Sequence, residues 1–431
     1  MAGGRRFGRS ASIVGALALV LALGACSNAS AGASAGGSGA PGVSAKEIDV
    51  GSLANITGPL SADFAPIVSG VQAYFDMVNA HGGVYGRKLV LKYQLDDQGE
   101  PTQDADLART LVTQDHVFAV VGVGTPFFVG AKYLAQTGTP AFGYQVSADW
   151  SDGPSLFGQN GSYLDTTTVS PIYAYLANQT GSTSVAVLAY GITESSAGCQ
   201  LVVKSLQNFG VPIGYEDLAI DFGEDMSTDV LQMKAHHVDM VISCMDLTGN
   251  IALSRALQQN GAGSIKQFWE DGYDRTQLAA YPQLMNGVYL LVQHVPFEAA
   301  ADFPGVYPGM QTYLATMQKY EPTNAYNEEA LDGWLNANLF VMGLQAAGKN
   351  PTQAKVVRDI NKMTDYVGAG LIQPVNWTVA HYESTQPSCV AMVQVQNGAF
   401  QPVFTNGSSV FICTDPSSDT PVAAPPGLPG G

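Results

Sequence analysis

The sequence predicts an α/β protein whose folded body has two lobes, each built on a doubly wound parallel sheet. Segments with the composition of buried strands alternate with segments of helical periodicity, which indicates parallel strands with right-handed crossovers. The alternation pauses after residue 143 and restarts at residue 184 with a second initial strand. At 431 residues, with 46% hydrophobic and 13% charged residues, the chain is long and apolar enough to form two cores.

The first lobe is predicted from residues 48–143. Apolar residues recur at helical spacing over residues 69–79, and Gly82-Gly83 end that helix. Residues 88–95 alternate strictly between apolar and polar side chains, which is typical of a half-exposed strand. In order, we expect strands at 48–53, 88–95, 118–121 and 139–143, helices at 69–79 and 101–111, and a further helix just past residue 126.

The second lobe repeats this pattern, and the chain then returns to helices. Ser195 or Ser196 is a suitable N-cap for the first helix of this lobe. Asn350 and Pro351 are expected to cap and begin the last long helix, and the pair Asn397-Gly398 predicts a tight hairpin. We expect strands at 184–189, 212–220, 239–243, 267–269, 288–292, 390–396 and 399–403, and helices at 195–209, 228–236, 249–259, 307–320, 328–347 and 352–363.

The N-terminus resembles an export signal. Three arginines precede an apolar run at residues 11–23 that is too short for a comfortable membrane span. The tetrapeptide Leu-Gly-Ala-Cys at residues 23–26 resembles a bacterial lipobox, so we expect Cys26 to be acylated and to anchor the chain. An ordinary secretory signal with an incidental cysteine is the alternative. The pair Arg5-Arg6 leaves both Sec and twin-arginine export open.

Charge and cysteine content exclude several kinds of partner and site. The formal net charge of −17 disfavours nucleic acid and anionic membrane surfaces as partners. After Cys26, an even set of four cysteines indicates two disulfides in an exported protein. Three pairings are possible, and we favour Cys199–Cys244 and Cys389–Cys413 because each joins residues within one local unit. No C-x-x-C occurs and His236-His237 lacks ligand spacing, so no metal site is expected.

Several short motifs follow one another in a recognisable order. They are Thr57-Gly58-Pro59, the stretch 79–89 with its Gly82-Gly83 and Gly86-Arg87, the pair Asp96-Asp97 before Pro101, and the strand end Val120-Val121-Gly122. Together they resemble the type I periplasmic binding proteins, in the leucine/isoleucine/valine-binding branch that serves ABC importers. The resemblance runs from about residue 48 to residue 403.

The resemblance implies how the segments are shared between the lobes. The chain would cross between lobes near Asp165, Pro296 and Val367, and three hinge strands suit a bend that opens and closes a cleft. The tail is rich in Pro, Gly and Ser and is predicted to be disordered. We expect a signal peptide at 1–25, a flexible tether at 26–45, a first lobe at 46–165 plus 298–366, a second lobe at 166–297 plus 367–414, and a disordered tail at 415–431.

The strand end at residues 120–124 leads into a lip where a ligand is expected. Gly122-Val123-Gly124 lacks the third glycine of a dinucleotide loop, since Phe127 holds that place, and this argues against a nucleotide. Thr125 and nearby amides at a helix N-terminus are candidates for binding an anionic ligand group, whereas Pro126 has no N–H to donate. The resemblance places a hydroxyl residue near Pro126, and this departure weakens the expectation of an α-amino-acid ligand.

The resemblance also implies a second lip at residues 144–147 and, across the cleft, an aromatic residue and an acid that binds a ligand ammonium. Asp271 or Asp246 would take the ammonium role, with a solvated loop acid as the alternative for either. For the aromatic candidates, packing in the core is the alternative role. The candidate ligand-binding residues are Phe64, Thr125, Pro126, Phe127, Tyr144, Gln145, Ser147, Tyr190, Asp246, Asp271 and Tyr273.

The function implied is that of a lipid-anchored solute-binding protein on the outer face of the cytoplasmic membrane. It would capture a small polar solute, such as a branched-chain amino acid or a related amide or aromatic acid, and deliver it to an ABC permease. We expect a monomer without a cofactor. No Ser/His/Asp order and no paired acid/base carboxylates indicate catalysis, so no enzyme is expected. A ligand-sensing receptor domain and an extracytoplasmic amidase are the alternatives.

Overall fold

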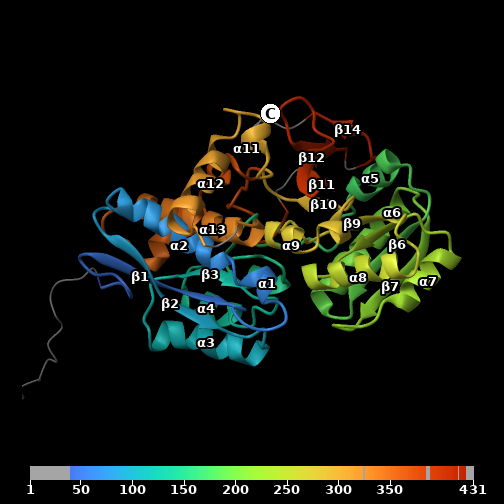
Figure 1. Cartoon of the computed structure of the whole chain (residues 1–431). Coiled ribbons are helices and arrows are strands. Elements are labelled where there is room, and N and C mark those ends of the chain that lie inside the picture. The colour runs from blue at the N-terminus through green and yellow to red at the C-terminus, as the bar shows by residue number, and fades with distance from the viewer. Residues whose placement is uncertain (1–38, 324–325, 385–388, 416, 424–431) are drawn as a thin grey trace, which may run out of the picture. The chain divides into compact units, whose positions relative to one another are not determined.

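The computed structural model describes residues 39–323, 326–384, 389–415 and 417–423, all of which belong to one compact unit. Within this unit, two open α/β sheets follow each other along the chain (Figure 1). Cys26 and most of the predicted tether lie outside the described residues. Among the described residues, no helix combines the length and the apolar character needed to cross a membrane.

The first sheet has five parallel strands in the order β2-β1-β3-β4-β5. β3 is buried along its whole length, as its run of Val and Gly predicts. β2 begins with alternating exposed and buried side chains, as its sequence pattern predicts. The strands are β1 (Glu47–Ala54), β2 (Lys88–Asp96), β3 (Val120–Gly124), β4 (Ala141–Gly143) and β5 (Leu156–Gly158).

Helices cover both faces of this sheet. Val121 belongs to one hydrophobic cluster together with residues of α2 and α13, while Val120 and Val123 belong to another with residues of α3 and α4. Adjacent strand residues therefore face opposite helical layers. The helices are α1 (Ser61–Phe64), α2 (Ile67–Ala80), α3 (Pro101–Thr113), α4 (Ala131–Thr137), α12 (Pro308–Tyr320), α13 (Glu328–Ala347) and α14 (Gln353–Ile360).

The helices α2 and α13 approach each other closely because glycine stands at both contact points. A Cβ on Gly70 would lie 1.8 Å from the carbonyl oxygen of Ala330, and a Cβ on Gly333 would lie 1.9 Å from that of Ile67. Neither position has room for a larger residue. This contact brings α13, which follows the parallel strands of the second sheet in the sequence, back against the first sheet.

The second sheet has nine strands, in the order β14-β13-β11-β10-β9-β8-β6-β7, with β12 paired to β11. Its strands run parallel from β7 to β10, and the pairs from β10 to β14 are antiparallel. The strands are β6 (Val185–Tyr190), β7 (Ile213–Ile220), β8 (Met240–Ser243), β9 (Lys266–Trp269), β10 (Tyr289–Val292), β11 (Cys389–Gln396), β12 (Ala399–Val403), β13 (Phe411–Thr414) and β14 (Pro421–Val422).

The helices that follow these parallel strands in the sequence match the predicted pattern, with several short additions. Tight turns such as Asn397-Gly398, where both residues have positive φ, join neighbouring strands as predicted. The helices are α5 (Ile172–Thr180), α6 (Thr193–Asn208), α7 (Ser227–Ala235), α8 (Leu247–Gln259), α9 (Arg275–Ala280), α10 (Pro282–Met285) and α11 (Ala299–Asp302).

The chain passes between the two sheets after β5, after β10 and again before β11. The second and third of these segments lie side by side, since His294 and Ile372 form a bridge and Val295 N–H donates to the Leu371 carbonyl at 2.7 Å. The first segment reaches the third through Ser162, whose N–H donates to the Ala380 carbonyl at 2.9 Å. The three crossings therefore touch one another, in agreement with the expected three-stranded hinge.

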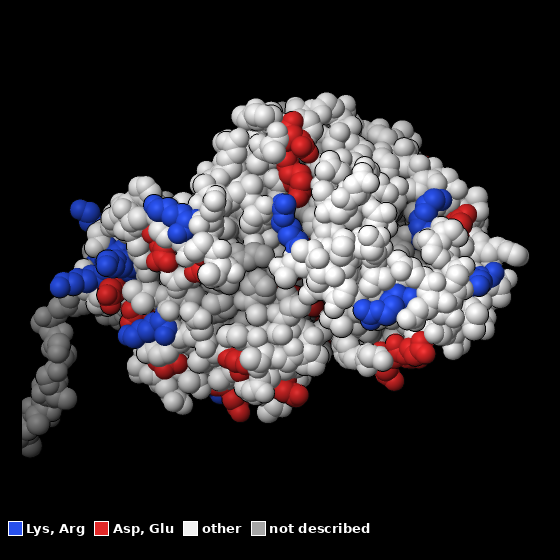
Figure 2. Space-filling model, in the orientation of Figure 1, with Lys and Arg blue, Asp and Glu red and all other residues white. Residues whose placement is uncertain are grey.

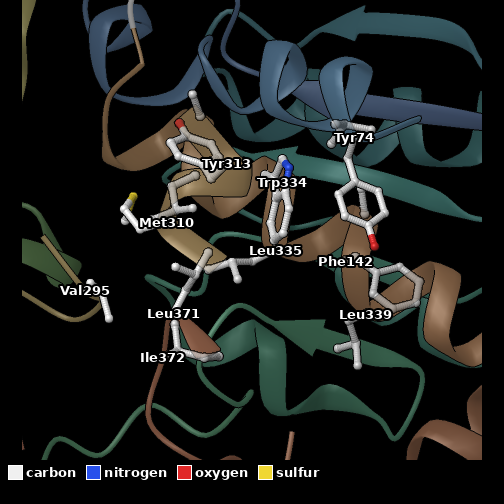
Figure 3. Close-up of a cluster of buried hydrophobic side chains, with 14 of the residues drawn as sticks. Tyr74, Phe142, Val295, Met310, Tyr313, Trp334, Leu335, Leu339, Leu371 and Ile372 are labelled. Atoms are coloured by element: carbon white, nitrogen blue, oxygen red, sulfur yellow. The ribbon is translucent and has the colours of Figure 1, made fainter. Parts of the chain in front are cut away.

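The main core surrounds α13, which is buried on nearly every face. Trp334 packs edge-on against Tyr74 at 4.7 Å between ring centroids and against Tyr313 at 6.0 Å (Figure 3). Leu335, directly after Trp334, and Leu339, about one turn further on, belong to the same buried core. A helix that is buried on nearly every side is stable only where other elements enclose it. Here α2, α14 and the strands β3 and β4 do so, together with Tyr313 of α12.

Two predicted helix starts are wrong. The N-cap of α14 is Thr352, whose hydroxyl accepts from the Lys355 N–H, so Asn350 and Pro351 precede the helix instead of beginning it. α6 begins at Thr193, and the hydroxyl of Ser195 donates to the Cys244 carbonyl instead of capping. The short elements β5, α5, β13 and β14 were not expected from the sequence, and β14 lies within the tail predicted to be disordered.

The structure contains two disulfides, Cys199–Cys244 and Cys389–Cys413, with the favoured pairing. The first joins α6 to the end of β8. The second joins the neighbouring antiparallel strands β11 and β13. Both therefore stabilise the second sheet and the helix packed on it.

Candidate functional site

A cleft of about 430 Å³ lies between the two sheets, and the loops at the carboxyl ends of their parallel strands line it. Lining residues follow β1, β3, β4 and β5 of the first sheet, and β6, β7, β8, β9 and β10 of the second. This is the edge at which open α/β sheets bind ligands. The volume falls within the usual range for small-molecule sites.

On the first lobe, the loop after β1 carries the lining residues Asp63 and Phe64 on α1. Asp96, at the end of β2, holds this loop, because its carboxylate accepts hydrogen bonds from the N–H of Ile56 and from the N–H and hydroxyl of Thr57. Asp63 is only 4% exposed, and its Oδ2 has no hydrogen-bond partner. The Asp-Asp pair noted in the sequence therefore helps to position the loop that reaches the cleft.

The two lips of the first lobe offer few free donors. Pro126 has no N–H, and the Tyr144 N–H donates to the Val123 carbonyl at 2.9 Å. The Gln145 N–H donates to Oε1 of Gln159 at 2.6 Å. Thr125 is 1% exposed and does not line the cleft. Its hydroxyl interacts with Asp97 and accepts from the Phe127 N–H at 3.4 Å. The remaining side-chain donors at this lip are Nε2 of Gln145, which has no partner, and the hydroxyl of Tyr144.

On the second lobe, Asp246 is the N-cap of α8 and accepts from the Gly249 N–H at 2.8 Å. The same oxygen accepts from the Tyr190 hydroxyl at 2.5 Å. Asn250, in the first turn of α8, donates to the carbonyls of Met245 and Asp271, which ties the loops after β8 and β9 together. These contacts explain why an Asp and an Asn stand at this helix start.

Asp63 from the first lobe meets Asp271 from the second, and the two carboxyl groups hydrogen-bond each other. The Leu247 N–H, at the start of α8, also donates to Asp63. Burial, together with the charges of Asp246 and Asp274, raises the pKa of Asp271 to about 7. Burial and then the charge of Asp271 raise the pKa of Asp63 well above its usual value. Two carboxyl groups in such contact retain a proton between them.

Glu270 extends this acidic surface. Burial raises its pKa to about 7, although a hydrogen bond with the Tyr173 hydroxyl favours the charged form. Its Oε1 has no hydrogen-bond partner. Behind it lies a chamber of about 20 Å³, which Glu328, Asp332 and His294 also line. Burial lowers the pKa of His294 to about 4, so its 3.5 Å contact with Glu328 is no ion pair at neutral pH.

The structure brings together most of the predicted ligand-binding residues. Ser147 donates to Asp149, and the buried Tyr273 stacks on Phe297 and donates to Glu298, so both are occupied within the protein. The residues that line the cleft are Phe64, Pro126, Tyr144, Gln145, Tyr190, Asp246 and Asp271, and those that do not are Thr125, Phe127, Ser147 and Tyr273.

Several lining residues were not among the sequence candidates, and four of them bear on the chemistry of the cleft: Asp63, Tyr173, Phe222 and Glu270. Phe222 follows the end of β7 and Glu270 follows the end of β9, so position after a strand was the available signal for both. Asp63 and Tyr173 belong to the unexpected short helices α1 and α5. For these two residues the sequence pattern offered no comparable signal.

The described residues hold no group of three or more His, Cys, Asp or Glu arranged to bind a metal ion. No Lys or Arg is among the described residues that line the cleft. On the outer face shown in Figure 2, basic and acidic side chains are interspersed without a large patch of one sign. The cleft therefore has its own acidic character, distinct from that mixed surface.

Comparisons with known proteins agree with this architecture. The Leu/Ile/Val-binding protein homolog 3 of Brucella melitensis is 37% identical over 79 residues, which are 18% of this chain and 21% of that protein. The chain thus matches about a fifth of that relative's length. The fatty acid ABC transporter substrate-binding protein from Thermomonospora curvata has a TM-score of 0.70 and 16% identity, over 88% of this chain and 95% of that one.

A second solved structure gives the same result. The branched-chain amino acid transporter substrate-binding protein from Streptococcus pneumoniae, in complex with isoleucine, has a TM-score of 0.68 and 16% identity, over 83% of this chain and 98% of that one. At these identities the structures show a shared fold. The family model described as periplasmic binding protein matches residues 47–399, which is most of the chain. The chain therefore belongs to the periplasmic binding protein family.

Proposed function

We propose that this protein is the extracytoplasmic substrate-binding component of an ABC importer, which captures a small organic solute between its lobes and presents it to a permease. The observation that supports this most directly is the cleft itself, lined from both sheets at the carboxyl ends of their parallel strands. The three crossing segments between the sheets provide a hinge about which the lobes close. A solute drives this closure by binding the closed form more tightly than the open form.

The names of the related proteins suggest which solutes to consider first. The names of the matched proteins refer to leucine, isoleucine and valine, to isoleucine, and to fatty acids. An ammonium group would interact with Asp271 and Asp246, as the family resemblance implies. The aromatic side chains Phe64, Tyr144 and Tyr190 would contact the apolar part of the solute.

The protein is proposed to act at the outer face of the cytoplasmic membrane, held there through an acylated Cys26. Replacing this residue in Cys26→Ser should release the protein from the membrane fraction without changing solute affinity. If the Cys26→Ser variant stays in the membrane fraction, Cys26 is not the anchor.

Solute-dependent closure is the test of the central proposal. Small-angle X-ray scattering should show a smaller radius of gyration when a solute from a broad panel of amino acids, amides, amines and organic acids binds. A thermal-shift screen selects the solute beforehand, since a ligand at a hundred times its dissociation constant stabilises by about 2.7 kcal/mol. The proposal fails if no solute of the panel changes either signal. Hydrolysis of a bound amide would identify an enzyme instead.

A further inference from the structure

We propose that the cleft selects organic cations, meaning amines or ammonium compounds with an apolar or aromatic body, and disfavours solutes that carry a carboxylate. This inference rests on the proposed function, because it names the solute class of the same cleft. It follows from the charges that line the cleft, the buried oxygen atoms that lack donors, and the donors that are already used.

Carboxyl groups enter the cleft from both lobes. Asp63 comes from α1 of the first lobe, and Asp246, Glu270 and Asp271 follow the strands β8 and β9 of the second. We call these four residues the cleft acids. Glu194 also lines the cleft, whereas no Lys or Arg does so in the part of the chain that the structure describes. A cation is therefore the ligand group that compensates this surface.

Two of the cleft acids have an oxygen without a hydrogen-bond donor. Asp63 is 4% exposed, and its Oδ2 is unpartnered, as is Oε1 of Glu270. A buried acceptor without a donor is costly, and buried polar groups in folded proteins are nearly always hydrogen-bonded. An ammonium group carries three N–H donors and would satisfy such oxygens while neutralising their charge.

At the two lips of the first lobe, most of the groups that would bind a carboxylate are absent or already occupied. Pro126 has no N–H, the hydroxyl of Thr125 is directed to Asp97, and the N–H groups of Tyr144 and Gln145 donate within the protein. The unpartnered Nε2 of Gln145 and the hydroxyl of Tyr144 remain, and both are neutral. This amide suits a hydroxyl or carbonyl oxygen of the solute, since a carboxylate there would also face the cleft acids.

Aromatic rings line both sides of the cleft. On the first lobe, the rings of Phe64 and Tyr144 lie 5.9 Å apart between centroids, and on the second, those of Tyr190 and Phe222 lie 4.2 Å apart. Phe222 is 48% exposed, so its ring is accessible to a solute in the cleft. Ring faces attract cations and cover apolar groups, so they suit an amine with a hydrocarbon body.

The test compares solutes that share a hydrocarbon body and differ in which charged groups they carry. Isothermal titration calorimetry at pH 8 would measure the binding of isopentylamine, leucine and 4-methylpentanoate, and of phenethylamine, phenylalanine and 3-phenylpropanoate. The inference predicts that each amine binds at least tenfold more tightly than its parent amino acid and its carboxylate counterpart.

The outcomes separate this inference from the proposed function. Leucine, phenylalanine or either carboxylate binding as tightly as the matched amine would overturn the selectivity for cations while supporting solute binding. Binding by none of the six compounds would also overturn it, and the broader closure screen would then decide the proposed function by itself.

Variants locate the effect in the cleft acids. Asp271→Asn and Asp63→Asn replace a carboxyl by an amide of the same shape, so each should fold, which the melting temperature verifies. Each should weaken the better amine at least tenfold. Glu100→Gln removes one negative charge from an exposed position outside the cleft and should leave the affinity unchanged. Equal affinities in wild type and both Asn variants would contradict the inference, as would an equal loss in Glu100→Gln.

Discussion

Raising the pH from 5 to 8 should strengthen the binding of an organic cation to the cleft. Burial and the charges of Asp246 and Asp274 raise the pKa of Asp271 to about 7, and a hydrogen bond with Asp63 acts in the opposite direction. Glu270 faces the same cleft and also has a pKa of about 7. An ammonium group gains its full interaction only with an ionised carboxylate, so loss of these protons at higher pH favours binding.

The size of the effect follows from the pKa. A carboxyl group with a pKa of about 7 is ionised to about 1% at pH 5 and to about 90% at pH 8. If the cation requires one such carboxylate to be ionised, its affinity rises about 90-fold between these pH values, which is about 2.7 kcal/mol. An alkylamine keeps its charge over this range, as a lysine side chain does, so the change reports on the protein.

Calorimetry with isopentylamine at pH 5, 6, 7 and 8 would measure this dependence. Titrations at pH 6 in two buffers with different ionisation enthalpies would count the protons released, and we expect about one per amine bound. In Asp271→Asn the slope should become shallower, whereas in Glu100→Gln it should persist. An affinity that is constant or falls from pH 5 to pH 8, without proton release, would refute the reasoning.

Three further predictions concern stability. Without a ligand, the free energy of unfolding should fall by about 3 kcal/mol from pH 6.5 to pH 8.5. Asp271 and Glu270, with a pKa of about 7, and Asp104, with a pKa of about 8, hold protons in the folded state, and losing these protons destabilises it. The range starts at pH 6.5 because two buried histidines with a pKa of about 4 have the opposite effect on stability at lower pH. Urea unfolding measures the change, and a free energy of unfolding that rises over this range would contradict the raised carboxyl pKa values. The double variant Cys199→Ser/Cys244→Ser removes the first disulfide, which spans 45 residues of sequence. In the chain-entropy model this should lower the free energy of unfolding by about 4 kcal/mol, measured by urea unfolding against untreated wild type. An unchanged unfolding midpoint would argue against the bond. Gly70→Ala or Gly333→Ala should lower the free energy of unfolding by at least about 1–3 kcal/mol, because the added methyl group overpacks α2 against α13. The control Gly210→Ala should cost less, since its Cβ would meet nothing within 4 Å, although its φ of +74° adds some strain. Equal melting temperatures for the three variants would show that the helices separate without cost.

Much of the cleft was predictable because it is assembled at strand ends. Tyr144, Asp246 and Asp271 each follow a buried strand, and strands with the turns after them leave local signatures in the sequence. The same rule also selected Thr125 and Tyr273, which lie outside the cleft lining. A position after a strand indicates the edge of the sheet, but it does not indicate the direction in which a loop side chain turns.

Those directions depend on partners far away in the sequence. Thr125 is turned towards Asp97, and Tyr273 donates to Glu298, so each hydroxyl is satisfied away from the cleft. Asp63 shows the converse, since nothing around it in the sequence indicates that it will meet Asp271 from the other lobe. Sequence reasoning also placed the carboxylate of a solute at the lip where the structure leaves few donors free.

The sequence by itself determined the two-lobed α/β fold, the order of its main strands and helices, and the favoured disulfide pairing. Periodicity, turn residues and caps act over a few neighbouring positions, so they can be recognised in the sequence without a structure. Only the tertiary structure decided which side chains face the cleft, which donors are already used, and which carboxyl groups share a proton. These properties depend on burial and on charges brought together across the chain, because the pKa of a group and the availability of a donor are set by everything packed around it.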